Sequence, residues 1–201
     1  CGNSGTTCRL IMGAISTTPL SAIFVGDKSL SHRPMDRVIE PLSGIGVKCT
    51  ARNGSFLPIT LEGISSAMPI DFESKVDSAQ VKSAILLAGL NSRGTTKYME
   101  RTLTRDHTER MLAAFGGKIK TEKTENGYAH YIQGLQELKP QEITVPSDPS
   151  SASFFIAAAL MVEGSDITIK NICMNETRIG FLKVVNEMGA RIEVKNKKTI
   201  S

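Results

Sequence analysis

The chain has 201 residues, of which 40% are apolar and 22% are charged, and its formal net charge is +4. This length suffices for one large core or two small ones, and the composition is that of a soluble globular protein. The mild positive charge argues against a nucleic-acid partner but suits an anionic small-molecule substrate, and no apolar run reaches the length of a membrane span.

The first third of the chain predicts a mixture of helices and strands. A glycine-rich stretch at 2–7 leads into an apolar helix, and Asn53-Gly54 is a typical hairpin turn between two strands. The elements expected here are helices at 6–17 and 34–44 and strands at 22–25, 46–51 and 57–62.

The middle third repeats this order. Its first helix is apolar nearly all round, which predicts burial, and the spacing of Asp106 and Glu109 predicts a capping box at the start of its second helix. The elements expected here are strands at 69–76, 95–100, 117–123 and 128–133 and helices at 78–90 and 106–115.

The last third opens at Asp148-Pro149, a helix cap followed by proline at the first helical position. The proline-rich segment 146–149 has the character of a hinge, so we expect a domain boundary there, between residues 1–146 and 147–201. The elements expected in the last part are strands at 141–146, 166–171 and 190–195 and helices at 149–162 and 178–187.

The three parts are internal repeats, and periodicity of this kind fixes the architecture. Each has a serine near the start of an apolar helix, an arginine ahead of a second helix, and a glycine after it. The matching residues are Ser4, Ser78 and Ser151, then Arg33, Arg105 and Arg178, then Gly46, Gly116 and Gly189. The sequence therefore predicts an α/β (α+β) fold of repeated βαβαββ units.

The start of the first helix carries residues suited to an anion. Glycines let the backbone approach a ligand closely, and a helix N-terminus offers free N–H groups. The stretch is not a phosphate-binding P-loop, because the lysine after the last glycine is missing, and a plain glycine turn is the alternative. Arg33 precedes Pro34 in an extended segment, where its guanidinium can form a fork on a carboxylate or phosphate, or simply face solvent.

The second repeat has related candidates. Ser78 and Gln80 lie at a helix start, where they bind a ligand or merely cap the helix. Arg105 occupies the place that Arg33 has in the first repeat, and its alternative role is a salt bridge to Asp106 or Glu109.

The remaining titratable residues do not indicate a catalytic pair. The three histidines, His32, His107 and His130, are scattered and have no serine or cysteine partner, so we expect them at the surface or at helix ends. Lys82 is expected on a solvated helix face.

The four cysteines, Cys1, Cys8, Cys49 and Cys173, show neither CxxC spacing nor a nearby histidine pair. They therefore indicate neither a zinc site nor a disulfide framework, and we expect a reduced, cytoplasmic protein. Because the chain begins with Cys1 inside a glycine-rich motif, we expect it to be an internal part of a longer protein.

Six ordered motifs together make the chain resemble the 5-enolpyruvylshikimate-3-phosphate (EPSP) synthase family, and the variants present are closer to the bacterial second class. They include Gly-Asn-Ser-Gly-Thr-Thr-Cys-Arg-Leu, Arg-Pro-Met-Asp-Arg and Thr-Arg-Asp-His-Thr-Glu. The matching stretches are residues 2–10, 33–37, 77–90, 104–112, 146–152 and 175–180.

The resemblance implies the two-globule enolpyruvyl transferase fold. It implies transfer of the enolpyruvyl group of phosphoenolpyruvate to the 5-hydroxyl of shikimate 3-phosphate, with release of phosphate, on the route to chorismate and aromatic amino acids. The reaction proceeds by addition and elimination with neither metal nor cofactor, and the family is the target of glyphosate. The resemblance further implies a monomer with small-molecule substrates and neither a nucleic-acid nor a membrane partner.

Residue roles follow from the resemblance position by position. Gly5, Thr6, Arg33 and Gln80 match phosphoenolpyruvate-binding positions, and Ser78, Gln80 and Arg105 match positions that bind shikimate 3-phosphate. The family's catalytic acid and base have no counterpart in the chain, so these roles stay unassigned and this part alone is expected to be inactive.

Three alternatives remain open at this stage. One is UDP-N-acetylglucosamine enolpyruvyl transferase, which uses a cysteine on a mobile loop, whereas Cys8 is expected in a helix and Cys49 on a strand. Another is a non-catalytic anion-binding module. The third is RNA-end processing, which shares related repeats, but its histidine motif is missing from the sequence.

Overall fold

The computed structural model describes residues 1–198 and separates into two compact units, Cys1–Pro140 and Gln141–Ser201. The division falls ahead of the segment 146–149, where the sequence placed a hinge. The assignment of the units to two globules stays a prediction. Within residues 1–198, no helix combines the length and the apolar character that crossing a bilayer requires.

The first unit contains two of the repeats, and nearly every predicted element forms within two residues of its expected bounds. A short 3-10 helix, η1 (Leu30–His32), forms between the expected strand at 22–25 and the expected helix at 34–44. The helices are α1 (Gly5–Ser16), α2 (Asp36–Ser43), α3 (Ala79–Gly89) and α4 (His107–Ala114). The strands are β1 (Ser21–Phe24), β2 (Lys48–Arg52), β3 (Phe56–Glu62), β4 (Asp71–Glu73), β5 (Thr95–Glu100), β6 (Ile119–Thr124) and β7 (Gly127–Gln133).

The two sheets of the first unit show the repeat directly. One sheet has the order β1-β3-β2 with antiparallel pairs, and the other has the order β4-β5-β7-β6. In the second sheet β4 and β5 are parallel, and the remaining pairs are antiparallel, so β5-β7-β6 reproduces β1-β3-β2. The predicted α/β class with repeated βαβαββ units is therefore confirmed for this unit.

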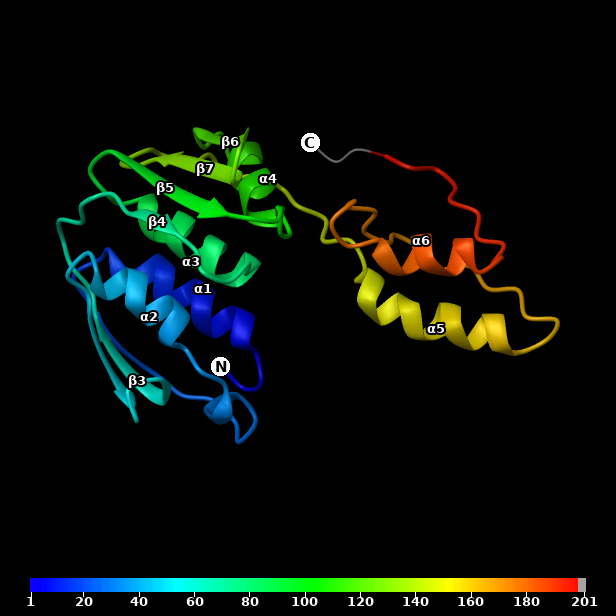
Figure 1. The fold of residues 1–201 in the computed structure, drawn as a ribbon, viewed down its shortest axis with the longest axis horizontal. Coiled ribbons are helices and arrows are strands. Elements are labelled where there is room, and N and C mark those ends of the chain that lie inside the picture. The colour runs from blue at the N-terminus through cyan, green and yellow to red at the C-terminus, as the bar shows by residue number, and fades with distance from the viewer. Residues whose placement is uncertain (199–201) are drawn as a thin grey trace. The chain divides into compact units, whose positions relative to one another are not determined.

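Helices α1, α2 and α3 lie between the two sheets, and α4 packs against β6 (Figure 1). The main core fills this layer with buried side chains such as Met12, Leu42, Leu61 and Ile85. Apolar burial of this kind is the main force that stabilises a folded domain. No residue of α3 is exposed, which explains the all-round apolar pattern of this second-repeat helix.

Helices α1 and α3 run parallel and approach each other closely. The Thr17 hydroxyl donates to the Ala88 carbonyl at 3.2 Å, near the C-terminal ends of both helices. A Cβ atom on Gly13 would lie only 2.2 Å from the Ala84 carbonyl oxygen, so only glycine permits this distance between the helix backbones. The close packing fixes the position of one helix start relative to the other.

The repeated glycines all follow a helix and all have left-handed backbone geometry. The φ angles are 96° at Gly46, 80° at Gly116 and 95° at Gly189. Glycine adopts this conformation without the steric penalty that a side chain brings, which is why it recurs after helices. The periodicity seen in the sequence therefore marks the same chain reversal three times.

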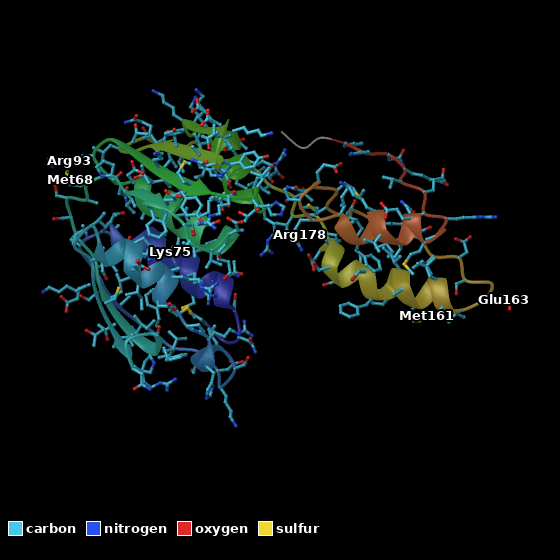
Figure 2. The ribbon with its side chains drawn as sticks, in the orientation of Figure 1. Met68, Lys75, Arg93, Met161, Glu163 and Arg178 are labelled. Carbon is cyan, nitrogen blue, oxygen red and sulfur yellow. The ribbon has the colours of Figure 1, made fainter. Side chains whose placement is uncertain are left out.

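The second unit contains α5 (Pro149–Met161), which ends just before Glu163 (Figure 2), and α6 (Gly180–Glu187). The strands expected at 141–146, 166–171 and 190–195 are wrong: the described residues of this unit form only one bridge, between Ser147 and Ile172. A strand needs a hydrogen-bonded neighbour, and β-propensity alone does not supply one.

Candidate anion-binding site

The starts of the parallel helices α1 and α3 meet at one place in the first unit. The Ser4 side chain caps α1 by accepting from Thr7 N at 3.1 Å, and the Ser78 side chain caps α3 by accepting from Val81 N at 3.4 Å. A helix start carries backbone N–H groups without a partner inside the helix, together with the positive end of the helix dipole. Two such ends at one place favour an anionic ligand.

A hydrogen-bonded network joins the two helix starts. Gln80 on α3 donates to the Thr6 hydroxyl on α1 at 2.8 Å and accepts from Arg9 at 2.7 Å. Arg9 also donates to the Pro34 carbonyl at 3.0 Å, which connects the segment that carries Arg33. Residues from three separate stretches of the sequence thus form one polar cluster.

Arg9 brings a buried positive charge to this cluster. Its side chain belongs to a residue that is only 8% exposed, and its Nε atom has no hydrogen-bond partner among the described residues. Burial lowers the pKa of Arg9, and repulsion from the neighbouring guanidinium of Arg37 lowers it further. Within residues 1–198 neither guanidinium has a carboxylate ion pair, so the site keeps an excess of positive charge.

Gly5 and Arg33 lie next to the same polar cluster. Arg33 donates to the Asn3 side-chain oxygen and to the Ser29 hydroxyl, the latter at 3.2 Å, so the glycine-rich stretch orients its guanidinium. A Cβ atom on Gly5 would lie 2.7 Å from Arg9 Nη1 and 3.6 Å from Arg33 Nη1. Gly5 therefore lets both guanidinium groups lie close to the start of α1, where a larger residue would collide with Arg9.

Ser78 and Arg105 lie on the α3 side of the site. Because the Ser78 hydroxyl accepts the capping bond, its own hydrogen is available to a ligand oxygen. Arg105 is exposed and makes no hydrogen bond or ion pair with the described residues. The alternative of a salt bridge is wrong, because Asp106 pairs with Arg110 at 2.7 Å and Glu109 pairs with Lys82.

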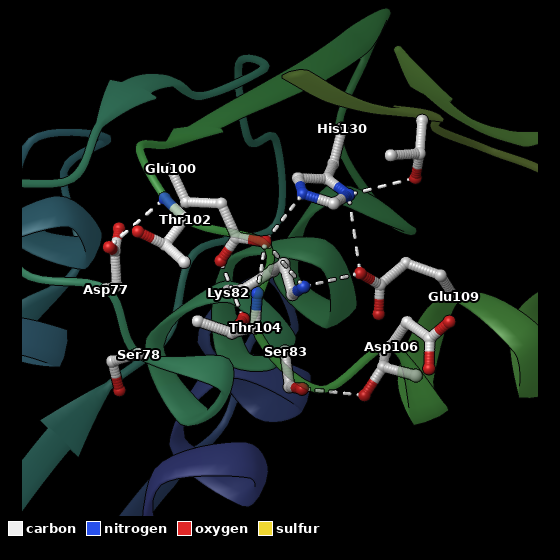
Figure 3. Close-up of polar contacts among 12 residues, drawn as sticks. Asp77, Ser78, Lys82, Ser83, Glu100, Thr102, Thr104, Asp106, Glu109 and His130 are labelled. Carbon is white, nitrogen blue, oxygen red and sulfur yellow. Dashed lines mark hydrogen bonds and ion pairs between the residues drawn. The ribbon is translucent and has the colours of Figure 1, made fainter. Parts of the chain in front are cut away.

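Beneath this side of the site lies a cluster of four buried charged or polar side chains (Figure 3). Lys82 Nζ is 2.9 Å from Glu100 Oε1 and 2.7 Å from Glu109 Oε1. His130 Nε2 donates to Glu100 Oε1 at 3.0 Å, and its Nδ1 is 2.9 Å from the Thr121 hydroxyl. We call Lys82, Glu100, Glu109 and His130 the buried charge cluster.

This cluster corrects two expectations. Lys82 and His130 have no exposed surface, although the sequence placed Lys82 on a solvated helix face and His130 at the surface or a helix end. Both are wrong because each side chain finds a carboxylate inside the protein, and a buried charge is tolerated when it is paired. His32, by contrast, is exposed as expected, with Nδ1 2.6 Å from the Lys28 carbonyl.

Glu100 stays ionised in the interior. Burial alone would raise its pKa, but hydrogen bonds from His130, Thr104 and Lys82 outweigh burial and hold the pKa at about 2. In the described part of the chain, no group of three or more histidine, cysteine or acidic side chains is arranged to hold a metal ion. The ammonium of Lys82 supplies the positive charge of the cluster instead.

The predicted capping box at α4 does not form. Asp106 occupies the N-cap position but makes no side-chain capping bond, and it accepts from Arg110 instead. Glu109 points to Lys82 in the interior rather than back to the helix start. The sequence spacing suited both arrangements, and the buried ammonium determines which one forms.

The third repeat, which lies in the second unit, has the same arginine contact as the first repeat. Arg178 donates to the Asp148 carboxylate and, at 2.9 Å, to the Ser150 hydroxyl at the start of α5. In sequence Arg178 follows Asp148 by 30 residues, the same separation that joins Arg33 to Asn3. In both repeats the arginine ahead of the second helix therefore reaches the start of the first helix.

The structure thus gathers Gly5, Thr6, Arg33 and Gln80 around the joined helix starts, with Ser78 at the cap of α3. It places Arg105 on the segment after β5, without a direct contact to the other predicted residues. Sequence reasoning missed Arg9. The available signal was its position four residues after Gly5, which puts both on one face of a helix.

Comparison with known proteins agrees with this geometry. A family model described as EPSP synthase (3-phosphoshikimate 1-carboxyvinyltransferase) matches residues 1–201. A 3-phosphoshikimate 1-carboxyvinyltransferase of Paracoccus denitrificans is 53% identical over 198 residues, which cover 98% of this chain and 45% of that protein. The corresponding protein of Novosphingobium aromaticivorans is 52% identical over 200 residues, covering 99% and 45%.

A solved structure of the EPSP synthase from Acinetobacter baumannii matches with a TM-score of 0.85 and 41% identity, over 98% of this chain and 44% of that one. The chain thus spans a little under half the length of the relatives it matches. With the whole chain matched in sequence and fold, and the motif residues gathered at one site, the protein belongs to the EPSP synthase family.

Proposed function

We propose that the protein transfers the enolpyruvyl group of phosphoenolpyruvate to the 5-hydroxyl of shikimate 3-phosphate and releases phosphate. The observation that carries this proposal is the junction of the α1 and α3 starts, where Arg9, Gln80 and Thr6 bond to one another beside Arg33. An electropositive site at two helix starts fits substrates that both carry phosphate. Membership of the EPSP synthase family names the reaction that such substrates undergo.

The residues divide between the two substrates. Arg33, oriented by Asn3, forms a fork on phosphoenolpyruvate beside Gly5, with Thr6 next to it. Ser78 and Arg105 hold shikimate 3-phosphate on the α3 side, and Gln80 lies between the two substrates.

Chemistry then proceeds by addition and elimination. The 5-hydroxyl oxygen bonds to C2 of phosphoenolpyruvate and gives up its proton, while the methylene carbon gains a proton and becomes a methyl group. In the elimination the methyl group loses a proton, the bond from C2 to the phosphate oxygen breaks, and the carbon–carbon double bond forms again. The site contributes by holding both substrates in the reacting orientation. The entropy cost of bringing them together is then met on binding and not in the chemical step. The acid and base stay unassigned.

The cysteines argue against the UDP-sugar alternative. Cys8 is fully buried within α1, and burial raises the pKa of its thiol. Burial likewise raises the pKa of Cys49, which lies on β2. A raised pKa disfavours the reactive thiolate, so neither residue suits the role of the loop cysteine.

The proposal also includes a cytoplasmic monomer without a nucleic-acid or membrane partner. All four cysteines are free thiols, which suits a reducing compartment.

Arg105→Ala tests the division of substrates. We expect it to weaken shikimate 3-phosphate by about fivefold to tenfold, because one exposed hydrogen-bonded contact is lost, and to leave phosphoenolpyruvate nearly unchanged. Calorimetric titration of each ligand into the protein that carries this chain measures both affinities. Equal losses for the two ligands, or no loss, would contradict the assignment. Release of phosphate only when both substrates are present separates the enzyme from a non-catalytic anion-binding module.

Gly5→Ala should separate phosphoenolpyruvate from glyphosate, the longer ligand. The added methyl group would lie 2.7 Å from Arg9 Nη1, so the end of the Arg9 side chain must shift, and it would lie 3.6 Å from Arg33 Nη1, next to the proposed ligand. Overpacking of a tight site costs roughly 1–3 kcal/mol, and the longer ligand bears more of that cost. Inhibition curves should show glyphosate weakened more than phosphoenolpyruvate. An unchanged inhibition constant would show that Gly5 does not face the ligand.

A further inference from the structure

Glu100 links the buried charge cluster to the segment that carries Arg105. Its carboxylate accepts from Lys82 and His130 on the interior side. On the other side Thr104 donates to it twice, from the backbone nitrogen at 3.0 Å and from the hydroxyl at 2.6 Å. Four donors from three parts of the chain fix the position of this carboxylate, and two of the four belong to Thr104.

A second carboxylate holds the beginning of the same segment. Asp77, the residue before the cap of α3, accepts from the backbone nitrogen of Arg101 at 2.9 Å. It also accepts from the backbone nitrogen of Thr102 at 3.1 Å (Figure 3). Four hydrogen bonds, from Arg101, Thr102 and Thr104, thus connect residues 101–104 to two carboxylates. These bonds leave the next residue, Arg105, at a fixed distance from the start of that helix.

The far side of the segment is held as well. The Ser83 hydroxyl on α3 is 2.6 Å from the Thr108 hydroxyl on α4, and Lys82 reaches Glu109 on α4. Arg105 therefore lies between two attachments to α3, while its own side chain is exposed and unpaired among the described residues.

We propose that Glu100 is a positioning residue, which the buried Lys82 and His130 hold in place so that Thr104 presents Arg105 to the phosphate of shikimate 3-phosphate. The inference rests on the proposed function, in which Arg105 binds that phosphate. The physical reason is preorganisation. A segment that hydrogen bonds already hold in place loses less conformational entropy when the ligand binds, so the affinity rises without an added contact.

The test is a double-mutant cycle at Thr104 and Arg105 in the protein that carries this chain. Thr104→Val removes the hydroxyl that donates to Glu100, whereas Thr104→Ser keeps it and serves as the matched control. Thr104 itself is assigned no contact with either substrate. Calorimetric titration with shikimate 3-phosphate should show a threefold to tenfold weaker affinity for Thr104→Val, an affinity close to the wild type for Thr104→Ser, and an unchanged affinity of both variants for phosphoenolpyruvate.

If Thr104 acts through Arg105, Thr104→Val should have no further effect once Arg105 is alanine. Losses that add in the double variant would overturn the positioning role, as would an unchanged affinity in Thr104→Val. If Arg105→Ala left the affinity for shikimate 3-phosphate unchanged, Arg105 would not bind its phosphate. That result would contradict this part of the proposed function and would overturn the inference with it.

Hydrogen exchange gives a readout that does not need a ligand. Thr104→Val should raise the exchange rate of the amides of residues 101–105 while those of β5 and β7 keep their protection. A general rise across β5 and β7 would mean that Thr104 serves the fold as a whole, which contradicts a positioning role.

Discussion

Lys82→Met should lower the free energy of unfolding of the protein by about 3–5 kcal/mol, the usual cost of removing one partner from a buried ion pair. Lys82 is completely buried, and its ammonium lies within 3 Å of two carboxylates. The methionine has a similar volume, so the loss reports charge rather than packing. Urea denaturation followed by circular dichroism measures it.

Lys75→Met is the matched control for this prediction. Lys75 pairs with Glu40 at 3.4 Å, but both side chains are largely exposed, and such pairs contribute little. The control should therefore unfold almost like the wild type. If the two variants lost the same free energy of unfolding, the buried charge cluster would stabilise the fold no more than an exposed ion pair does.

The pH dependence follows from the pKa of Glu100. Because the folded pKa of about 2 lies below the ordinary value of 4.5, its stabilising effect is complete above pH 4.5 and is lost as the pH falls toward 2. In Lys82→Met the missing ammonium no longer lowers the pKa of Glu100, so the folded pKa of this carboxylate rises. Protonation then relieves the buried charge at low pH, so the deficit of the variant should be smaller at pH 5 than at pH 8.

Arg33→Ala should lower kcat/KM for phosphoenolpyruvate roughly tenfold to a hundredfold, because a charge-assisted fork is removed. The Arg33 guanidinium lies close to Gly5, and its hydrogen bonds to Asn3 and Ser29 hold it there. Steady-state kinetics with saturating shikimate 3-phosphate isolate the effect on phosphoenolpyruvate.

Two further variants give this result its meaning. Arg33→Lys should recover little activity, because a lysine ammonium cannot form the planar fork. Arg93→Ala also removes one positive charge, but Arg93 follows the C-terminal end of α3, opposite Gln80, and it should behave as the wild type. Full activity in Arg33→Lys would show that Arg33 contributes only charge.

The repeats could be predicted from the sequence because their signals are local. Gly46, Gly116 and Gly189 follow helices, and Asn53-Gly54 closes a hairpin with positive φ at both residues. Such turns depend on neighbouring residues alone. The strands expected in the second unit failed because pairing depends on distant segments, which local pattern does not describe.

The buried charge cluster could have been found from strand periodicity. Thr96, Tyr98 and Glu100 alternate along β5 and all three are buried, so the carboxylate of Glu100 required a cation in the interior. Lys82 was the natural partner, because it lies in a helix whose nearly all-round apolar pattern predicted burial. The sequence did not predict that α3 packs against β5, and this packing is what buries both charges.

The most direct test of the account is a structure of the protein that carries this chain with shikimate 3-phosphate and phosphoenolpyruvate, or glyphosate, bound. We expect phosphoenolpyruvate or glyphosate within hydrogen-bonding distance of Arg33 and Gln80, above Gly5. We expect the phosphate of shikimate 3-phosphate to contact Ser78 and Arg105. Ligands bound away from the joined starts of α1 and α3 would contradict the account.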